Sequence, residues 1–107
     1  MKRFDFLVLG SGIAGLSFAL KAAKRGRVAI VTKKNRAESN TNYAQGGIAG
    51  VLDPDDHFDD HIADTLAAGK GLCDPKVVTM VVSEAPTRIR ELMNWGTRFD
   101  QQDGQVA

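Results

Sequence analysis

The sequence lacks the features that build disulfides, metal clusters and membrane spans. Cys73 is the only cysteine among 107 residues, so no intrachain disulfide can form, and a single thiol cannot by itself hold zinc or an iron–sulfur cluster. No segment approaches the roughly 18–20 apolar residues that span a bilayer. The apolar run after Arg3 is short and is broken by Asp5, whereas a secretory signal needs a longer apolar stretch and a small-residue cleavage site. These absences favour a cytoplasmic protein without a membrane partner.

The sequence also lacks an excess of charge of either sign. It has 14 Lys and Arg residues against 13 Asp and Glu residues, which gives a formal net charge of +1. A nucleic-acid partner usually requires a concentrated positive surface, so we expect none. Hydrophobic residues make up 43% and charged residues 25% of the sequence, as is ordinary for a globular protein, and the length suits one small domain.

The first third of the sequence predicts a strand, a helix and a second strand. Residues 4–9 (FDFLVL) form a short apolar run, which is typical of a buried strand. Residues 13–25 carry apolar side chains at helical spacing, and Gly26 is expected to cap the C-terminus of this helix. Residues 27–32 (RVAIVT) predict the second strand. A strand, a helix and a strand within about 30 residues make a βαβ unit with a right-handed crossover.

The remainder predicts helices after a long loop. Residues 33–56 show little periodicity, and loops of that length inside a compact domain are usually functional. A helix is expected over residues 58–68. Parallel sheets are normally buried on both faces, so two strands do not make a stable sheet alone. We therefore expect an α/β fold in which this chain forms the opening part of a larger domain.

Two further helices are expected near the C-terminus. Asp74 and Pro75 fit the cap and the first turn of the first of them. Ser83, with Pro86 three residues later, predicts a break and a new cap. The last helix is then expected to end at Gly96.

A glycine-rich motif lies between the first strand and the first helix. It reads Gly10-Ser11-Gly12-Ile13-Ala14-Gly15 and matches G-x-G-x-x-G in the context that this dinucleotide-binding motif needs. Gly10 permits the tight turn, Gly12 lets the backbone approach a pyrophosphate, and Gly15 lets the helix pack on the strand. The helix N-terminus would hold the diphosphate. The alternative is a glycine-rich turn that binds nothing.

The acidic residue that usually accompanies this motif is missing. Dinucleotide-binding folds place Asp or Glu about 20 residues on, where it binds a ribose hydroxyl. Here the second strand runs into Thr32, Lys33 and Lys34, and the next acid is Glu38. One interpretation is an NADP site in which a lysine meets the 2′-phosphate. Another is a nucleotide site that holds the ribose with a hydroxyl and a lysine, and the third is a solvent-facing strand end.

One interpretation of residues 53–64 (DPDDHFDDHIAD) is a metal site. His57 and His61 are four residues apart, so a helix would bring them to one face near Asp60 and Asp64. The segment lacks the Glu of the zinc-protease pattern, and acidic residues also suit the first turn of a helix. We predict a solvated helix start and no metal site.

Four stretches together resemble the L-aspartate oxidase family. They are FDFLVLGSGIAGLSFAL near the N-terminus, Thr32-Lys33 at the strand end, NTNYAQGGIAGV from Asn40, and HIADTLAAGKGLCD from His61. The resemblance extends from Phe4 to about Asp100. More distantly, the sequence is similar to the flavoprotein subunits of succinate dehydrogenase and fumarate reductase.

The resemblance implies an FAD-binding segment. In this superfamily Ser or Thr followed by Lys replaces the strand-end acid, which makes NADP the weaker interpretation. The AQGG stretch lies against the flavin, whose carbonyls and ring nitrogens need donors and acceptors. The implied cofactor-binding residues are Gly10, Ser11, Gly12, Ile13, Ala14, Gly15, Thr32, Lys33, Asn40, Thr41, Asn42, Tyr43, Ala44, Gln45, Gly46 and Gly47.

Asn40 separates the related families. Succinate dehydrogenase and fumarate reductase subunits usually carry at this position the His that bonds covalently to FAD, and Asn has no such chemistry. Noncovalent FAD is therefore expected, although the oxidase family usually has Ser here. Tyr43 and the GLCD stretch also favour the oxidase.

The implied reaction is oxidation of L-aspartate to iminoaspartate. FAD takes the hydride and is reoxidised by oxygen, giving hydrogen peroxide, or by fumarate, giving succinate. Iminoaspartate then feeds quinolinate synthase in NAD biosynthesis. The family's catalytic Arg and His residues lie beyond residue 107, so no catalytic residue is assigned. Residues 1–107 are expected to be the N-terminal portion of an FAD-binding domain, without the capping and C-terminal helical domains and inactive alone. A non-catalytic nucleotide-sensing module is a further alternative.

Overall fold

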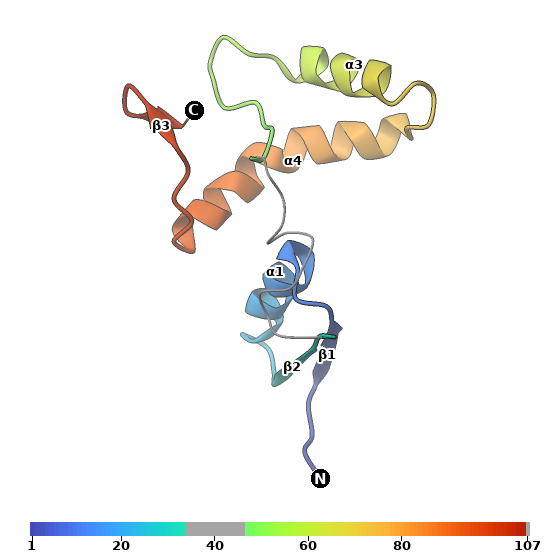
Figure 1. Cartoon of the computed structure of the whole chain (residues 1–107), viewed down its shortest axis with the longest axis vertical. Coiled ribbons are helices and arrows are strands. Elements are labelled where there is room, and N and C mark those ends of the chain that lie inside the picture. Colours follow the sequence, from blue (N-terminus) through green and yellow to red (C-terminus); the bar gives the residue numbers. More distant parts are fainter. Residues whose placement is uncertain (34–46, 107) are drawn as a thin grey trace. The chain divides into compact units, whose positions relative to one another are not determined.

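The computed structural model describes residues 1–33 and 47–106. The chain divides into two compact units, Met1–Gly46 and Gly47–Ala107. The elements in chain order are β1 (Phe6–Leu9), α1 (Ile13–Ala22) and β2 (Val28–Val31) in the first unit, then α3 (Phe58–Ala68), α4 (Pro75–Asn94), β3 (Gln101–Gln102) and β4 (Gln105–Val106) in the second (Figure 1). The predicted α/β class is confirmed.

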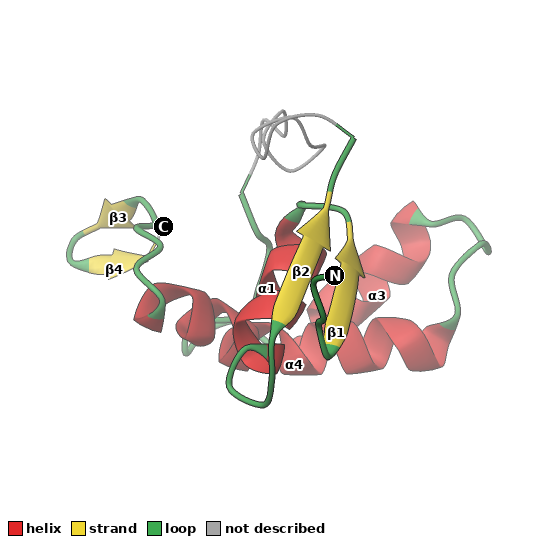
Figure 2. Ribbon diagram, turned by 90° about the horizontal axis from the view of Figure 1, so that it is seen from below, coloured by secondary structure: helices red, strands yellow, loops and turns green. Residues whose placement is uncertain are grey.

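The first unit is the predicted βαβ unit. β1 and β2 pair in parallel, with Leu9 opposite Val31 at the end of the register. Helix α1 lies against one face of the two strands (Figure 2). Val8 of β1 is buried together with Ala19 and Ala22 of α1. The small alanine side chains allow the helix backbone to approach the strands closely, whereas Leu16 and Leu20 of the same helix are 41% and 53% exposed.

Gly26 does not cap helix α1, and this prediction was wrong. The helix ends at Ala22, with Ala23 as its C-cap. Gly26 is needed instead because Asp5 lies against it, and a Cβ there would be only 2.6 Å from Asp5 Oδ2. The same Asp5 oxygen accepts a hydrogen bond of 2.8 Å from the backbone N–H of Arg27. Gly26 therefore allows the Asp5 side chain to approach the backbone just before β2.

In the second unit, α3 packs beside α4 and the two helices run in opposite directions (Figure 1). The turn between them includes two residues with positive φ, Lys70 (50°) and Gly71 (86°). Cys73 lies within this turn and its thiol donates a hydrogen bond of 3.8 Å to the Thr65 carbonyl oxygen. A Cβ on Gly69 would overlap the Cys73 sulfur. Cys73 thus fills space where the turn meets α3.

Helix α4 begins as the sequence predicted. The Asp74 carboxylate accepts hydrogen bonds from the backbone N–H groups of Lys76 at 2.9 Å and Val77 at 3.4 Å. Pro75 lies in the first turn, where a backbone donor is not needed. The cap satisfies two of the donors that every helix N-terminus leaves without an intrahelical partner.

The predicted break at Ser83 and Pro86 is absent, because α4 continues through both residues. A proline inside a helix removes one backbone donor and crowds the preceding turn, at a cost of about 3 kcal/mol. Val82 and Ile89 are only 4% and 3% exposed, and Pro86 is buried on the same face between them. The backbone of Gly50 lies directly against the Ile89 side chain. Burial of this face favours one continuous helix.

A short hairpin near the C-terminus was not predicted. β3 and β4 pair antiparallel, with Gln102 opposite Gln105. The two residues between them, Asp103 and Gly104, have φ values of 52° and 79°, as a type I′ turn requires. The Asp-Gly pair is a strong hairpin signal, but the strands are too short to show an alternating pattern.

No helix within residues 1–33 and 47–106 is both long and apolar enough to cross a membrane.

Replacing Asp74 with Ala should destabilise α4. The N–H groups of Lys76 and Val77 lose their acceptor, and we expect the free energy of unfolding to fall by about 1 kcal/mol. Urea denaturation followed by circular dichroism measures the change in the full-length protein. Asp64→Ala, which removes an exposed carboxylate from the middle of α3, is the control. Equal losses in the two variants would contradict the capping role.

Candidate functional site

The glycine turn joins β1 to α1 and presents the N-terminus of that helix. Gly10 has a φ of 109°, in the region that favours glycine. Gly12 is the N-cap and has no side chain to accept a hydrogen bond, and the first turn of α1 contains no acidic residue. A helix start of this kind combines backbone donors with the positive end of the helix dipole. It fits the diphosphate of a dinucleotide.

Gly15 holds α1 close to the turn. A Cβ at this position would overlap the Gly10 carbonyl oxygen and would lie 3.3 Å from Cγ1 of Val8. Both the turn and β1 therefore contact the helix where only a glycine fits. This is the role that the motif predicts for its third glycine.

The turn and the end of the second strand meet at one edge of the sheet. The backbone N–H of Gly10 donates to the carbonyl oxygen of Val31 at 2.8 Å. One residue further along each strand, the Ser11 hydroxyl donates to Oγ1 of Thr32 at 3.2 Å, across 21 residues of sequence. The sequence indicated both residues as cofactor contacts but gave no sign that their side chains touch, since this depends on the strand register.

Of the remaining predicted site residues, Ile13 and Ala14 are the first two residues of α1. Lys33 follows Thr32 directly and its side chain is exposed. Gly47 is described as part of the second unit. Asn40, Thr41, Asn42, Tyr43, Ala44, Gln45 and Gly46 lie outside the described residues, as does Lys34. The structure therefore brings together Gly10, Ser11 and Thr32 from the predicted set.

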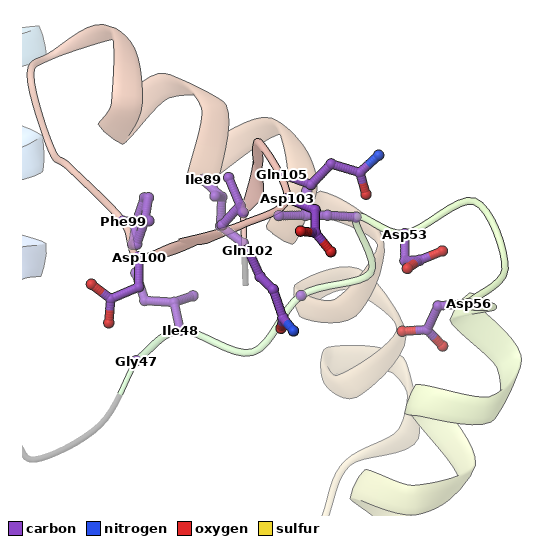
Figure 3. Close-up of a pocket in the computed structure, with 13 residues that line it drawn as sticks. Gly47, Ile48, Asp53, Asp56, Ile89, Phe99, Asp100, Gln102, Asp103 and Gln105 are labelled. Carbon is purple, nitrogen blue, oxygen red and sulfur yellow. The ribbon is translucent and has the colours of Figure 1, made fainter.

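The second unit contains a cavity of about 550 Å³, which Gly47 helps to line together with Ile89 and Phe99 (Figure 3). Four other lining residues carry carboxylates: Asp53, Asp56, Asp100 and Asp103. Two of them precede α3 and two belong to the segment of the unpredicted hairpin. Because like charges repel, this cavity does not suit a phosphate or a dicarboxylate substrate. The glycine turn of the first unit, where the first turn of α1 contains no acidic residue, is the better candidate for binding an anion.

The two histidines lie at the start of α3 and in its first half, and the His57 side chain makes no capping hydrogen bond. His57 is the N-cap residue, and Asp59 and Asp60 lie in the first turn, where the helix dipole favours negative charge. In the part of the chain that the structure describes, His, Cys, Asp and Glu side chains nowhere form a group of three or more that could hold a metal ion.

Comparison with known proteins connects this geometry to a cofactor. The model of a family described as "FAD binding domain" matches residues 5–107. An L-aspartate oxidase of Arabidopsis thaliana, named as chloroplastic, is 52% identical over 106 residues, which are 98% of this chain and 16% of that protein. An L-aspartate oxidase of Vibrio cholerae is 44% identical over 99 residues, which are 92% of this chain and 18% of that protein.

A solved structure is similar over nearly the whole chain. A mutant of the quinol fumarate reductase of E. coli superposes on this chain with a TM-score of 0.88 at 35% sequence identity. The superposition covers 97% of this chain and 18% of the fumarate reductase chain. The chain thus spans less than a fifth of the length of each of these three proteins.

Replacing Gly15 with Ala should loosen the glycine turn. The added methyl group meets the Gly10 carbonyl, a backbone atom that cannot rotate away, and we expect the free energy of unfolding to fall by about 1–3 kcal/mol. Thermal or urea unfolding of the full-length apoprotein measures the loss. Ser17→Ala changes the same helix to Ala without this overlap and should leave stability within about 0.5 kcal/mol. An unchanged Gly15→Ala protein would refute the close packing.

Proposed function

The chain belongs to the FAD binding domain family, and on that premise we propose that it is the N-terminal FAD-binding segment of an L-aspartate oxidase. The observation that carries the cofactor assignment is the meeting of the glycine turn, whose N-cap residue Gly12 has no side chain, with Thr32 at one sheet edge. The oxidase assignment is supported by 52% identity to a plant enzyme of that name over 98% of the chain. Identity to the fumarate reductase is lower, at 35%.

Each part of the site has a proposed partner in the cofactor. The N-terminus of α1 binds the diphosphate, with the glycines allowing close backbone approach. Thr32 and Lys33 bind the ribose of the adenosine half. Residues 40–47 contact the flavin. The family match favours this assignment over an NADP site built on Lys33 and Lys34. Such an NADP site would leave residues 40–47 without a role.

The proposed reaction is the oxidation of L-aspartate to iminoaspartate. When bound, FAD supplies the acceptor for the hydride that leaves the substrate α-carbon. Residues 1–107 bind and orient the cofactor, and the groups that hold the substrate carboxylates and move protons are assigned to the rest of the protein. Oxygen and fumarate are the proposed electron acceptors, and a quinolinate synthase is the proposed user of the product. The proposed location is the cytoplasm, although the plant relative is named as chloroplastic.

The exposed apolar side chains of β1 support the proposal that this chain is one portion of a larger FAD-binding domain. Leu7 and Leu9 are 65% and 77% exposed, on the face of the strand opposite to buried Val8. A parallel sheet is normally covered on both faces. Further segments of the same domain are proposed to cover this face, which agrees with the small share of its relatives that the chain spans.

The FAD is proposed to be bound without a covalent link, because Asn40 stands where a covalently linked His would be required. The full-length protein should show a flavin absorbance spectrum, and acid precipitation should release all of the colour into the supernatant. Colour retained in the pellet would show a covalent flavin and would overturn the inference from Asn40. A colourless protein that cannot be reconstituted with FAD would overturn the proposed function.

The substrate assignment predicts which small molecule reduces the flavin. Under anaerobic conditions, L-aspartate should bleach the flavin absorbance of the full-length protein, and succinate should not. With oxygen present, L-aspartate should yield hydrogen peroxide. Bleaching by succinate and not by L-aspartate would instead assign the protein to the fumarate reductase and succinate dehydrogenase type, which the structural similarity makes the second candidate.

A further inference from the structure

Ser11 is a buried polar side chain in a position where the glycine motif makes no demand. The second residue of G-x-G-x-x-G can be of many types, because the turn geometry depends on the glycines. Ser11 is nevertheless only 5% exposed, and its hydroxyl donates to Oγ1 of Thr32 at 3.2 Å. A buried hydroxyl that is not required by the turn indicates a role through the group that it contacts.

The Ser11–Thr32 contact extends the pairing of β1 and β2 by one side-chain hydrogen bond. The last backbone bond at this edge runs from the Gly10 N–H to the Val31 carbonyl oxygen at 2.8 Å. Ser11 and Thr32 each follow this bond by one residue, so the pairing of the strands brings their backbones close enough for the hydroxyls to meet. Thr32 lies at the carboxyl end of β2, where ligands of open α/β sheets bind.

The contact restricts how the Thr32 hydroxyl can point. A hydroxyl has one proton and two lone pairs, so either partner of such a pair can donate. The contact between the Ser11 and Thr32 oxygens at 3.2 Å occupies one of these groups on Thr32 and leaves the others for a ligand. A carboxylate at this position only accepts a hydrogen bond from ribose, whereas a hydroxyl can donate or accept.

We propose that Ser11 is a positioning residue that orients the Thr32 hydroxyl toward a ribose hydroxyl of the FAD adenosine, with which Thr32 forms a hydrogen bond. This inference rests on the proposed function, because it assumes that the sheet edge holds the adenosine half of FAD. It places a neutral hydroxyl at the ribose, where an acidic residue is usually found. Ser11 acts through Thr32 and does not need to touch the cofactor.

The test compares nucleotides that differ by one hydroxyl. Isothermal titration calorimetry on the full-length apoprotein measures the Kd of ADP, 2′-deoxy-ADP and 3′-deoxy-ADP. One deoxy analogue should bind about threefold to tenfold more weakly than ADP, the usual value of one hydrogen bond. In Ser11→Ala and in Thr32→Val this ratio should fall below about twofold. Thr32→Ser, which keeps the hydroxyl, should preserve it, as should the control Ser17→Ala.

The ratio separates positioning from a structural effect. If Ser11→Ala weakens ADP and both deoxy analogues by the same factor, Ser11 only supports the turn and the proposal is wrong. The proposal is also wrong if the ratio of Kd values is unchanged in Ser11→Ala, or if the wild-type protein does not distinguish the three nucleotides. Either result leaves FAD binding by the protein intact. Ser11→Gly, which removes the hydroxyl from a position that tolerates glycine, gives the same comparison should Ser11→Ala fail to fold. An apoprotein that binds neither ADP nor FAD refutes the proposed function itself.

Discussion

The parallel pairing of β1 with β2 is the interaction on which the candidate site depends. Its register places Leu9 opposite Val31, and the bond from the Gly10 N–H to the Val31 carbonyl oxygen brings the glycine turn beside the end of the second strand. Helix α1 can follow this turn so closely only because Gly15 has no side chain to meet the Gly10 carbonyl. The strand pairing, the glycine turn and the start of α1 therefore depend on one another. A shift of the strand register would separate Ser11 from Thr32.

The second unit is organised around one helix in the same way. Asp74 fixes where α4 begins, and the buried face that includes Val82 and Ile89 keeps it continuous. Gly50 brings the segment before α3 against that face. The cavity beside Ile89 is lined by several carboxylates, whereas the first turn of α1 contains no acidic residue. The carboxylates repel an anion, and the helix dipole of α1 attracts one.

Sequence patterns predicted the features that local chemistry determines. The βαβ unit followed from two apolar runs and a helical period, and the Asp74 cap followed from one residue type beside a proline. The predicted break at Pro86 was wrong because the prediction considered only the local cost of a proline. It did not include the burial of Pro86, which is known only from the folded chain. Gly26 was misassigned for a similar reason, since its neighbour Asp5 is distant in sequence. The Ser11–Thr32 contact needed the strand register, which no single segment contains.

The hydrogen bond between Ser11 and Thr32 joins two neutral side chains at a strand end where dinucleotide-binding folds usually place a carboxylate. Neither a serine nor a threonine hydroxyl gains or loses a proton in the range where Asp, Glu and His titrate. The strand end therefore carries no negative charge of its own at Thr32 that would oppose a nearby diphosphate. The contribution proposed for Thr32 in nucleotide binding is therefore expected to be the same in acid and neutral solution and to be insensitive to salt, unlike that proposed for the adjacent Lys33.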